Sequence, residues 1–343
     1  MPSAADPSVV GELAAAQAAA GRPLRFDEFM RVALYGDHGF YTSGGQAGRR
    51  GDFLTAPEVG PLFGAVLARW IDAEHRRLGC PADFTVVESG AGPGTLARAV
   101  LLAAPQWAGR YVAVEVSAAQ RAKHPDGVTS LAEMPEDPFT GVVIANELLD
   151  NLPFRLAVFD GGWREALVEV GADGRLGEIL APAPPQWAFL PPSAPHGARA
   201  PVQEVAREWV GDARRSVLAG SVLVLDYFTP LTAALALEPW RAWLRTFRGH
   251  ERGAHYLKDV GLQDITAQVC LDQLPEPDAL RTQAQFLQLW GIDELVEEGR
   301  REWQAAAAAP GLHALMMRSR LGEAEALLEP AGLGGFLAAE WRS

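Results

Sequence analysis

The run Val86-Val87-Glu88-Ser89-Gly90-Ala91-Gly92-Pro93-Gly94-Thr95 decides the fold, because three glycines separate a strand pattern from a helix pattern. Residues 84–88 predict a buried strand, and the apolar spacing in 95–104 predicts a helix. Glycines at the carboxyl end of such a strand let the backbone approach a ligand and aim free N–H groups at an anion. The alternative is that the glycines only turn the chain.

The glycine spacing separates two classes of cofactor. It is G-x-G-x-G, whereas a dinucleotide site has G-x-G-x-x-G, so NAD is disfavoured. S-adenosyl-L-methionine fits better, because it carries a carboxylate for the helix start and cationic charge for Glu88. Glu115 ends the next predicted strand, 110–116, where an acid can accept hydrogen bonds from ribose hydroxyls; the alternative is a solvated strand end. The predicted cofactor-binding residues are Glu88, Gly90, Gly92, Gly94, Glu115 and Asn146.

A second constellation, Ala145-Asn146-Glu147-Leu148-Leu149-Asp150-Asn151-Leu152-Pro153, directly follows the predicted strand 142–145. In an open α/β sheet that strand end faces the same crevice as the glycine loop. Glu147 and Asp150 could grip a planar cation such as a guanidinium, and Asn146 could bond cofactor or substrate. These three are the predicted catalytic residues. The alternative is helix capping by Asn146 and a surface carboxylate at Asp150.

Short apolar runs, turns and helices continue to alternate along the chain, as a parallel α/β sheet requires. A β-hairpin is expected around Asp160-Gly161-Gly162. The further expected elements are strands at 156–159, 165–170 and 221–228, helices at 61–78, 202–218 and 279–301, and a closing helix and strand at 328–341.

Composition excludes several classes of protein. The 343 residues are 48% hydrophobic and 21% charged, which excludes a largely disordered chain. The sequence shows no apolar run of the length of a membrane span and no basic leader typical of a signal peptide, so neither is expected. The net charge of −13 disfavours nucleic acid and favours a cationic small molecule or basic protein segment. Two cysteines predict a reducing, cytoplasmic location, and His250 and His255 alone predict no metal site.

Several runs, in this order, resemble the MidA family of S-adenosylmethionine-dependent methyltransferases, whose mitochondrial members methylate an arginine of a respiratory complex I subunit. The likeness covers about residues 24–270. The runs that carry it are Tyr35-Gly36-Asp37-His38-Gly39-Phe40-Tyr41-Thr42, Gly51-Asp52-Phe53-Leu54-Thr55-Ala56-Pro57-Glu58, the glycine loop, residues 146–153 and Leu225-Asp226-Tyr227.

The resemblance implies an α/β fold with a doubly wound, mostly parallel, seven-stranded class I methyltransferase (Rossmann-like) sheet and an added helical and loop region that covers the substrate. It implies an N-terminal covering region at 1–80, a cofactor-binding core at 81–229 with a hairpin near 155–170, an acceptor-side insertion at 230–327 and a return to the core at 328–343. A lid over the donor or substrate would comprise Gly51, Asp52, Phe53, Thr55, Pro57 and Glu58.

The chain also departs from the family pattern E-L-G-P-G-R-G-T-L, since it has Ser89, Ala91 and Pro93, and Gln268 stands where the family has histidine. We expect a methyltransferase that converts S-adenosyl-L-methionine to S-adenosyl-L-homocysteine while methylating a protein arginine nitrogen. The alternatives are methylation of a small molecule or peptide and a non-catalytic assembly role, with a dehydrogenase last. The expected partner is a protein or small-molecule acceptor, without nucleic acid, and a homodimer is the possible assembly.

Overall fold

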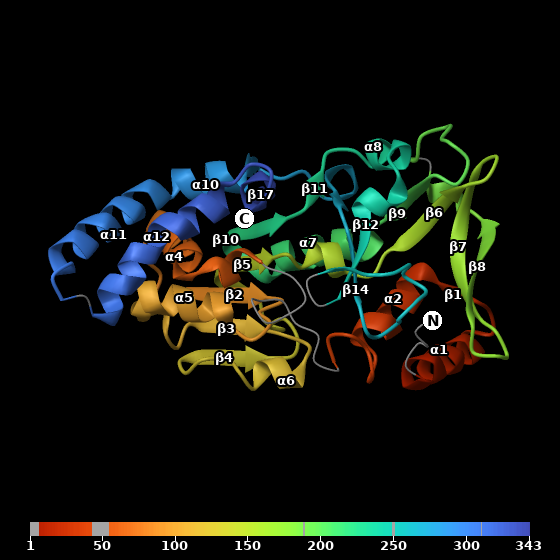
Figure 1. The fold of residues 1–343 in the computed structure, drawn as a ribbon, viewed down its shortest axis with the longest axis horizontal. Helices are drawn as coiled ribbons and strands as arrows, with labels where there is room; N and C mark the ends of the chain where they lie inside the picture. The colour runs from red at the N-terminus through yellow and green to blue at the C-terminus, as the bar shows by residue number, and fades with distance from the viewer. Residues whose placement is uncertain (1–6, 43–54, 188, 249–250, 310) are drawn as a thin grey trace. The chain divides into compact units, whose positions relative to one another are not determined.

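The computed structural model describes residues 7–42, 55–187, 189–248, 251–309 and 311–343 (Figure 1). The chain forms two compact units, each built from three separated segments. The first unit comprises residues 1–53, 148–212 and 227–276 and the second comprises 54–147, 213–226 and 277–343. Helix α7 (Glu204–Ser216) has residues in both units.

The second unit contains a seven-stranded sheet in the order β16-β17-β10-β5-β2-β3-β4. Neighbouring strands from β10 to β4 are parallel, and β17 is antiparallel to both β10 and β16. The predicted seven-stranded α/β sheet is confirmed as a mixed sheet, whose antiparallel pairs both involve β17. The strands are β2 (Thr85–Ser89), β3 (Tyr111–Val114), β4 (Val128–Leu131), β5 (Phe139–Asn146), β10 (Val217–Asp226), β16 (Ala279–Thr282) and β17 (Leu337–Arg342).

The central strands are continuous apolar runs because both faces of the sheet are buried. Val142, Val143 and Ile144 of β5 are all fully buried. Strands β5 and β2 approach so closely at Gly141 (φ +154°) that a Cβ there would lie 1.9 Å from the Thr85 carbonyl oxygen. The glycine is therefore a requirement of the strand pairing.

Helices pack on this sheet, as Figure 1 shows for α4 and α5 beside β2 and β3. Helix α4 packs on α5, and Gly64 permits the contact, since a Cβ would lie 2.4 Å from the Ala99 Cβ. Helices α11 and α12 lie against each other. The helices are α3 (Ala56–Val59), α4 (Pro61–Arg77), α5 (Thr95–Ala103), α6 (Ala118–Arg121), α10 (Gln283–Leu289), α11 (Ile292–Ala306) and α12 (Leu312–Leu328).

The expected single helix over residues 279–301 is wrong at its start. Residues 279–282 form β16, because their pairing with β17 overrides helix propensity. A capping box at Thr282 then begins α10, and Gly291 (φ +84°) separates α10 from α11. Helical spacing alone could not separate these three elements.

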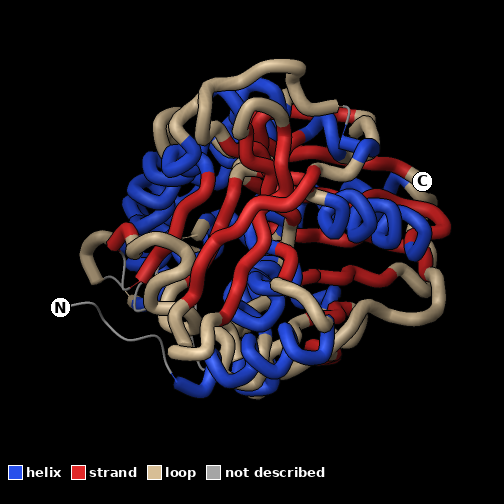
Figure 2. Tube along the Cα trace, turned by 90° about the vertical axis from the view of Figure 1, so that its right-hand side faces the viewer, coloured by secondary structure: helices blue, strands red, loops and turns tan. Residues whose placement is uncertain are grey.

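The first unit contains a five-stranded antiparallel sheet in the order β1-β7-β6-β9, with β8 paired to β7. The predicted hairpin is confirmed as β6 and β7. Figure 2 draws the strands in red and the helices in blue. The elements of this sheet and the nearby helices are β1 (Leu24–Arg25), β6 (Arg155–Phe159), β7 (Trp163–Val170), β8 (Leu176–Pro182), β9 (Arg199–Val202), α1 (Pro7–Ala20) and α2 (Phe26–Tyr35).

Two smaller sheets complete the first unit, in the orders β13-β12-β14 and β11-β15. They share an apolar core with α2, whose buried stripe includes Phe26, Phe29 and Met30. The remaining elements are β11 (Phe228–Thr229), α8 (Thr232–Leu237), α9 (Trp240–Trp243), β12 (Leu244–Arg248), β13 (Glu251–Arg252), β14 (Asp264–Ala267) and β15 (Val269–Cys270). None of the helices in the described part of the chain has the length and apolar character needed to cross a bilayer.

Candidate cofactor and acceptor site

The candidate site lies at the carboxyl edge of the seven-stranded sheet, beside β2 and β5. The chain order of the strands reverses there, because β3 and β4 follow β2 on one side while β5 lies on the other. Ser89 pairs with both Val114 and Ala145, so the loops after β2, β3 and β5 begin at the same level. Ligands of open α/β sheets bind in the crevice at such a reversal.

The glycine loop follows β2 as predicted, and its backbone explains its composition. Gly90, Gly92 and Gly94 have φ of +72°, +53° and +77°, in the left-handed region that favours glycine. Apart from Gly92 and its two chain neighbours, no described residue has an atom within 4 Å of a Cβ placed on Gly92. The backbone at Gly92 therefore borders open space into which a ligand could come close.

The loop does not present the free N–H groups that the sequence predicted. The N–H groups of Gly90 and Ala91 donate to the Val114 carbonyl, and that of Gly94 donates to the Ala91 carbonyl. The Gly92 N–H donates to Glu115, and Pro93 has none. The loop therefore offers close backbone approach rather than an anion cradle of its own.

Glu115 lies directly after β3, and its carboxylate holds the glycine loop. Oε2 accepts the Gly92 N–H at 3.0 Å, and Oε1 accepts the Ser117 N–H at 2.8 Å. A carboxylate can accept about four hydrogen bonds, so capacity for further donors remains on both oxygens. Glu115 is partly exposed at the predicted edge of the site.

Glu88 lies on β2 but faces the protein interior. Its side chain is 5% exposed and accepts a hydrogen bond of 2.8 Å from the Tyr111 hydroxyl. Burial raises its pKa to about 8, while the Tyr111 hydroxyl and the Ala97 N–H of α5 oppose the rise. These contacts tie β2 to β3 and to the first turn of α5, so contact between Glu88 and a ligand stays a prediction.

His124 also contacts the glycine loop, although no sequence pattern predicted it. Its Nε2 lies 2.9 Å from the Gly92 carbonyl oxygen, and its Nδ1 lies 2.8 Å from the Ser130 hydroxyl. The carbonyl can only accept, so Nε2 carries the proton. A lone histidine 32 residues from the glycine it supports gives no local sequence signal.

Part of the predicted lid lies beside the glycine loop within the second unit. The Thr95 hydroxyl, at the start of α5, donates to Glu58 Oε1 at 2.6 Å. Thr55 and Pro57 are buried at the start of α3, and Pro57 occupies the first turn, as expected from its fixed φ. Gly51, Asp52 and Phe53 lie outside the described residues.

Asn146 ends β5, and Glu147 follows it at the same edge. The amide nitrogen of Asn146 donates to Glu147 Oε1 at 3.3 Å, and the Ala56 N–H of α3 approaches the same oxygen at 3.4 Å. The Asn146 Oδ1 is buried and accepts no hydrogen bond from any described residue. Glu147 has φ +50°, a left-handed conformation that is uncommon for a non-glycine residue and is concentrated at functional sites.

The third predicted catalytic residue, Asp150, belongs to the first unit. It is 5% exposed, and its Oδ2 accepts a hydrogen bond from the Thr266 hydroxyl of β14. Burial raises the pKa of Asp150 to about 6, and burial together with Asp150 raises that of Asp264 to about 7. Its predicted part in catalysis stays a prediction.

The sequence predicted no metal site at His250 and His255, and the structure describes only His255. His255 lies in the first unit beside Tyr256, and His250 falls outside the described residues. In the ranges that the structure describes, no group of three or more His, Cys, Asp or Glu side chains is arranged to hold a metal ion.

The chain is similar to several known methyltransferases. A protein arginine methyltransferase NDUFAF7 homolog of Drosophila melanogaster is 31% identical over 44% of this chain and 42% of its own. The mitochondrial protein arginine methyltransferase NDUFAF7 of Danio rerio is 25% identical over 86% of this chain and 79% of its own. For the fly, cattle and Xenopus tropicalis relatives, the chain spans about half of the relative's length.

A solved structure from Burkholderia thailandensis, bound to S-adenosyl-homocysteine, is similar over the whole chain. It covers 100% of this chain and 95% of its own, with 25% identity and a TM-score of 0.81. Residues 66–288 match the family described as "Putative S-adenosyl-L-methionine-dependent methyltransferase", which is more than half of the chain. The chain therefore belongs to this family of S-adenosyl-L-methionine-dependent methyltransferases.

Proposed function

We propose that the protein transfers a methyl group from S-adenosyl-L-methionine to a nitrogen of a protein arginine. The observation that carries the proposal is the set of groups at one sheet edge: the glycine loop, Glu115, Asn146 and Glu147. Family membership and the Burkholderia structure bound to S-adenosyl-homocysteine support the cofactor. The relatives described as protein arginine methyltransferases support the acceptor. When bound, the cofactor supplies a methyl group activated on a sulfonium.

The residues after β2 and β3 fit such a cofactor. Gly92 borders open space, so backbone and ligand can come close without a side chain between them. Glu115 retains acceptor capacity for the two hydroxyls of a ribose, while its bond to the Gly92 N–H fixes the carboxylate beside the loop. We assign Gly90, Gly92, Gly94 and Glu115 to cofactor binding, and Glu88 to positioning α5 beneath them.

The residues after β5 and in α3 suit a cationic acceptor. Glu147 and Glu58 are partly exposed carboxylates, and their positions are fixed by hydrogen bonds to the Ala56 N–H and the Thr95 hydroxyl. Carboxylates hold a guanidinium through charge-assisted hydrogen bonds, which fixes the direction of its nitrogen. The buried Oδ1 of Asn146 can accept a further N–H from the ligand.

These residues would contribute chiefly by alignment. Transfer forms a bond from nitrogen to the methyl carbon, breaks the carbon–sulfur bond and leaves the nitrogen with a proton to lose. Glu147 is the proposed carboxylate that orients the nitrogen and receives this proton. Because fixed geometry lowers the entropy cost of the step, a small displacement of Glu147 should reduce turnover strongly.

We further propose that the mixed sheet is the doubly wound methyltransferase sheet that the sequence implied. Of the predicted lid, Thr55, Pro57 and Glu58 would lie over the bound ligands, and Gly51, Asp52 and Phe53 lie outside the described residues. A cytoplasmic location is also proposed, and the free thiols of Cys80 and Cys270 agree with it. Light scattering during size-exclusion chromatography would test the expected homodimer.

Calorimetric titration with S-adenosyl-L-homocysteine tests the cofactor assignment. We expect saturable binding by the purified chain, no binding of NAD, and binding weakened by about tenfold or more in Glu115→Ala, because a charge-assisted hydrogen bond is lost. Glu325→Ala, on the exposed face of α12, is the matched control. Absence of binding, or equal binding of NAD, would exclude the proposed cofactor.

Methyl transfer to protein tests the acceptor. The protein is incubated with S-adenosyl-L-methionine labelled in the methyl group and with a bacterial protein extract, and the labelled proteins are hydrolysed to amino acids. Label in methylarginine, absent with Glu147→Gln, is the expected result. Label in methyllysine or in a small molecule would instead support another acceptor class. No label in any fraction, despite cofactor binding, would support a non-catalytic role.

A further inference from the structure

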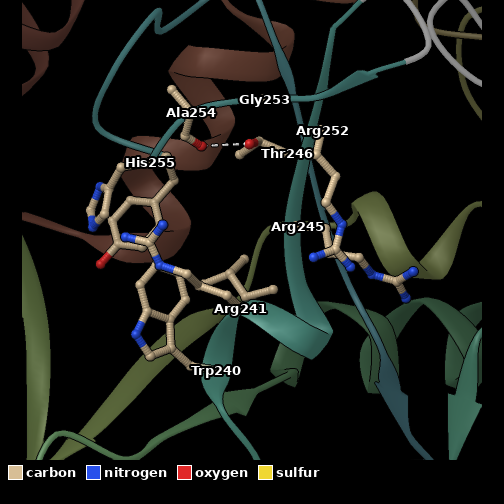
Figure 3. Close-up of a pocket in the computed structure, with 10 residues that line it drawn as sticks. Trp240, Arg241, Arg245, Thr246, Arg252, Gly253, Ala254 and His255 are labelled. Atoms are coloured by element: carbon tan, nitrogen blue, oxygen red, sulfur yellow. Dashed lines mark hydrogen bonds between the residues drawn. The ribbon is translucent and has the colours of Figure 1, made fainter.

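The first unit contains a small cavity at the β12–β13 edge of its three-stranded sheet. Its volume is about 90 Å³, and its lining includes Trp240, Arg241, Arg245, Arg252, His255 and Tyr256. Figure 3 shows Trp240, Arg241 and His255 on one side of the view, with Arg245 and Arg252 on the other. All these residues belong to one unit, so the cavity is defined within that unit.

The lining is strongly basic in a protein with a net charge of −13. Three arginines line the cavity, and none of its described lining residues is acidic. Within the described ranges, these three arginines form no ion pair, whereas Arg199 is paired with Glu178 at 2.6 Å. Positive charge is therefore concentrated at this cavity, although the chain as a whole is acidic.

Aromatic rings hold two of the arginines by their faces. The Arg241 guanidinium lies 4.8 Å from the Trp240 ring centroid, and that of Arg245 lies 5.1 Å from the Tyr227 ring centroid. A guanidinium that stacks on a ring uses its face, while its N–H donors point outward along its edge. Stacking thus orients the donors without satisfying them.

Two further observations indicate a positive site that lacks an acceptor. The Nε of Arg245 is buried and has no hydrogen-bond partner among the described residues, an arrangement that is costly for a charged donor. The pKa of His255 is lowered, first by burial and then by the charge of Arg199. Glu178, which is paired with Arg199, opposes this shift, and Arg241 and Lys258 add to it. The charge of Arg245 acts on the buried Asp150, lowering its pKa against the larger effect of burial. The Asp150 carboxylate accepts a hydrogen bond from the Thr266 hydroxyl.

We propose that this pocket is a binding site for an oxyanion, the carboxylate or phosphate group of a ligand. Its volume of about 90 Å³ suits one such group rather than a whole nucleotide. Arg241, Arg245 and Arg252 would donate to the oxygens, and Trp240 would cover the apolar side. The site is independent of the proposed methyl transfer, because Arg241, Arg245 and Arg252 have no part in that reaction.

Calorimetric titrations of the full chain test the site with three probes: inorganic phosphate, glutarate and an acetylated pentaglutamate peptide. At low salt we expect saturable binding of at least one probe, weakened by high salt because screening reduces charge attraction. Arg252→Gln and Arg245→Gln should each weaken it by about tenfold, the loss expected for one charge-assisted hydrogen bond. A preference for phosphate would identify a phosphoryl ligand, and a preference for the other two an acidic side chain.

Arg175→Gln is the matched control, because it removes the same charge from an exposed position of the same unit. It should leave the dissociation constant within about twofold. Arg252 is exposed, so its substitution should leave folding intact even if Arg245→Gln lowers the thermal midpoint. The proposal is overturned if no probe binds up to about 10 mM, or if Arg175→Gln weakens binding as much as Arg252→Gln.

Discussion

Replacement of Glu88 by glutamine separates a structural from a ligand-binding role for this buried acid. Glutamine has nearly the same shape and can still accept the hydrogen bond from the Tyr111 hydroxyl. It removes only the ability to ionise. The variant therefore isolates the consequence of holding a carboxyl group with a pKa of about 8 beneath the glycine loop.

The structure gives the sign and size of the effect. The pKa of Glu88 is about 8 in the folded chain and ordinarily 4.5, so folding binds a proton between these pH values. The stability that the protonated group contributes is complete below pH 4.5 and is lost as the pH rises to 8. At about 1.36 kcal/mol for each pH unit, the full loss is about 5 kcal/mol. Because glutamine does not ionise, Glu88→Gln should not lose this stability.

Urea unfolding followed by circular dichroism measures the difference at several pH values from about 5.5 to 8.5. Relative to the wild type, Glu88→Gln should gain about 1.4 kcal/mol of unfolding free energy for each pH unit until the pH approaches the folded pKa. Comparison with the wild type removes the contributions of Asp150 and Asp264, which titrate in the same range. Glu325→Gln, an exposed substitution in the same unit, should show no such gain.

If the difference in unfolding free energy between wild type and Glu88→Gln does not change with pH, burial does not raise the pKa of Glu88 and the prediction is refuted. Cofactor binding supplies a second readout. If Glu88 only positions α5, affinity for S-adenosyl-L-homocysteine should stay within about threefold of the wild type. A loss of about tenfold or more would instead indicate that Glu88 contacts the ligand, as the sequence predicted.

Three further substitutions test other parts of the structure. Glu147→Gln should leave cofactor affinity nearly unchanged but lower methyl transfer by about 100-fold or more, measured with labelled cofactor; unchanged turnover would remove Glu147 from the site. Gly92→Ala should cost about 1–2 kcal/mol in urea unfolding, because its φ is +53°, and should weaken cofactor binding in calorimetry. Arg155→Met should lower the free energy of unfolding by about 3–5 kcal/mol, because the buried Glu165 loses its two 2.7 Å hydrogen bonds. In the double variant with Glu165→Leu, urea unfolding should show that this stability is recovered.

The fold was predictable where apolar period and turn chemistry agree. Strand β2, helix α5 and the β6–β7 hairpin were expected within one or two residues, because glycines mark where each ends or begins. The strand β16 was not predictable, because its identity depends on pairing with β17, over fifty residues away. Residues 230–264 give weak signals because their strands are short: β12 has five residues and β13 has two.

The candidate site was predictable to the extent that topology alone brings residues together. Parallel strands end at one edge, so the order of strands and loops along the chain is enough to group Glu115, Asn146 and Glu147 with the glycine loop. The contacts of Glu88 and His124 depend on side-chain direction and on a partner strand, which spacing does not contain. The arginines of the pocket in the first unit are spread over residues 241–252 without a motif, so only the folded β12–β13 edge groups them.

The sheet edge in the second unit also departs from local rules in three ways. Glu88 is an acid held away from water, Asn146 keeps a buried acceptor without a described donor, and Glu147 adopts a left-handed backbone. Each feature costs free energy by itself, and a chain selected only for stability would replace them with an amide, an apolar residue and a glycine. The concentration of these features at the carboxyl ends of two adjacent strands supports the proposed site, where Asn146 and Glu147 would contact the ligands and Glu88 would position α5. Glu147→Gly relieves the backbone, so we expect it to raise the free energy of urea unfolding while it abolishes the transfer of labelled methyl groups.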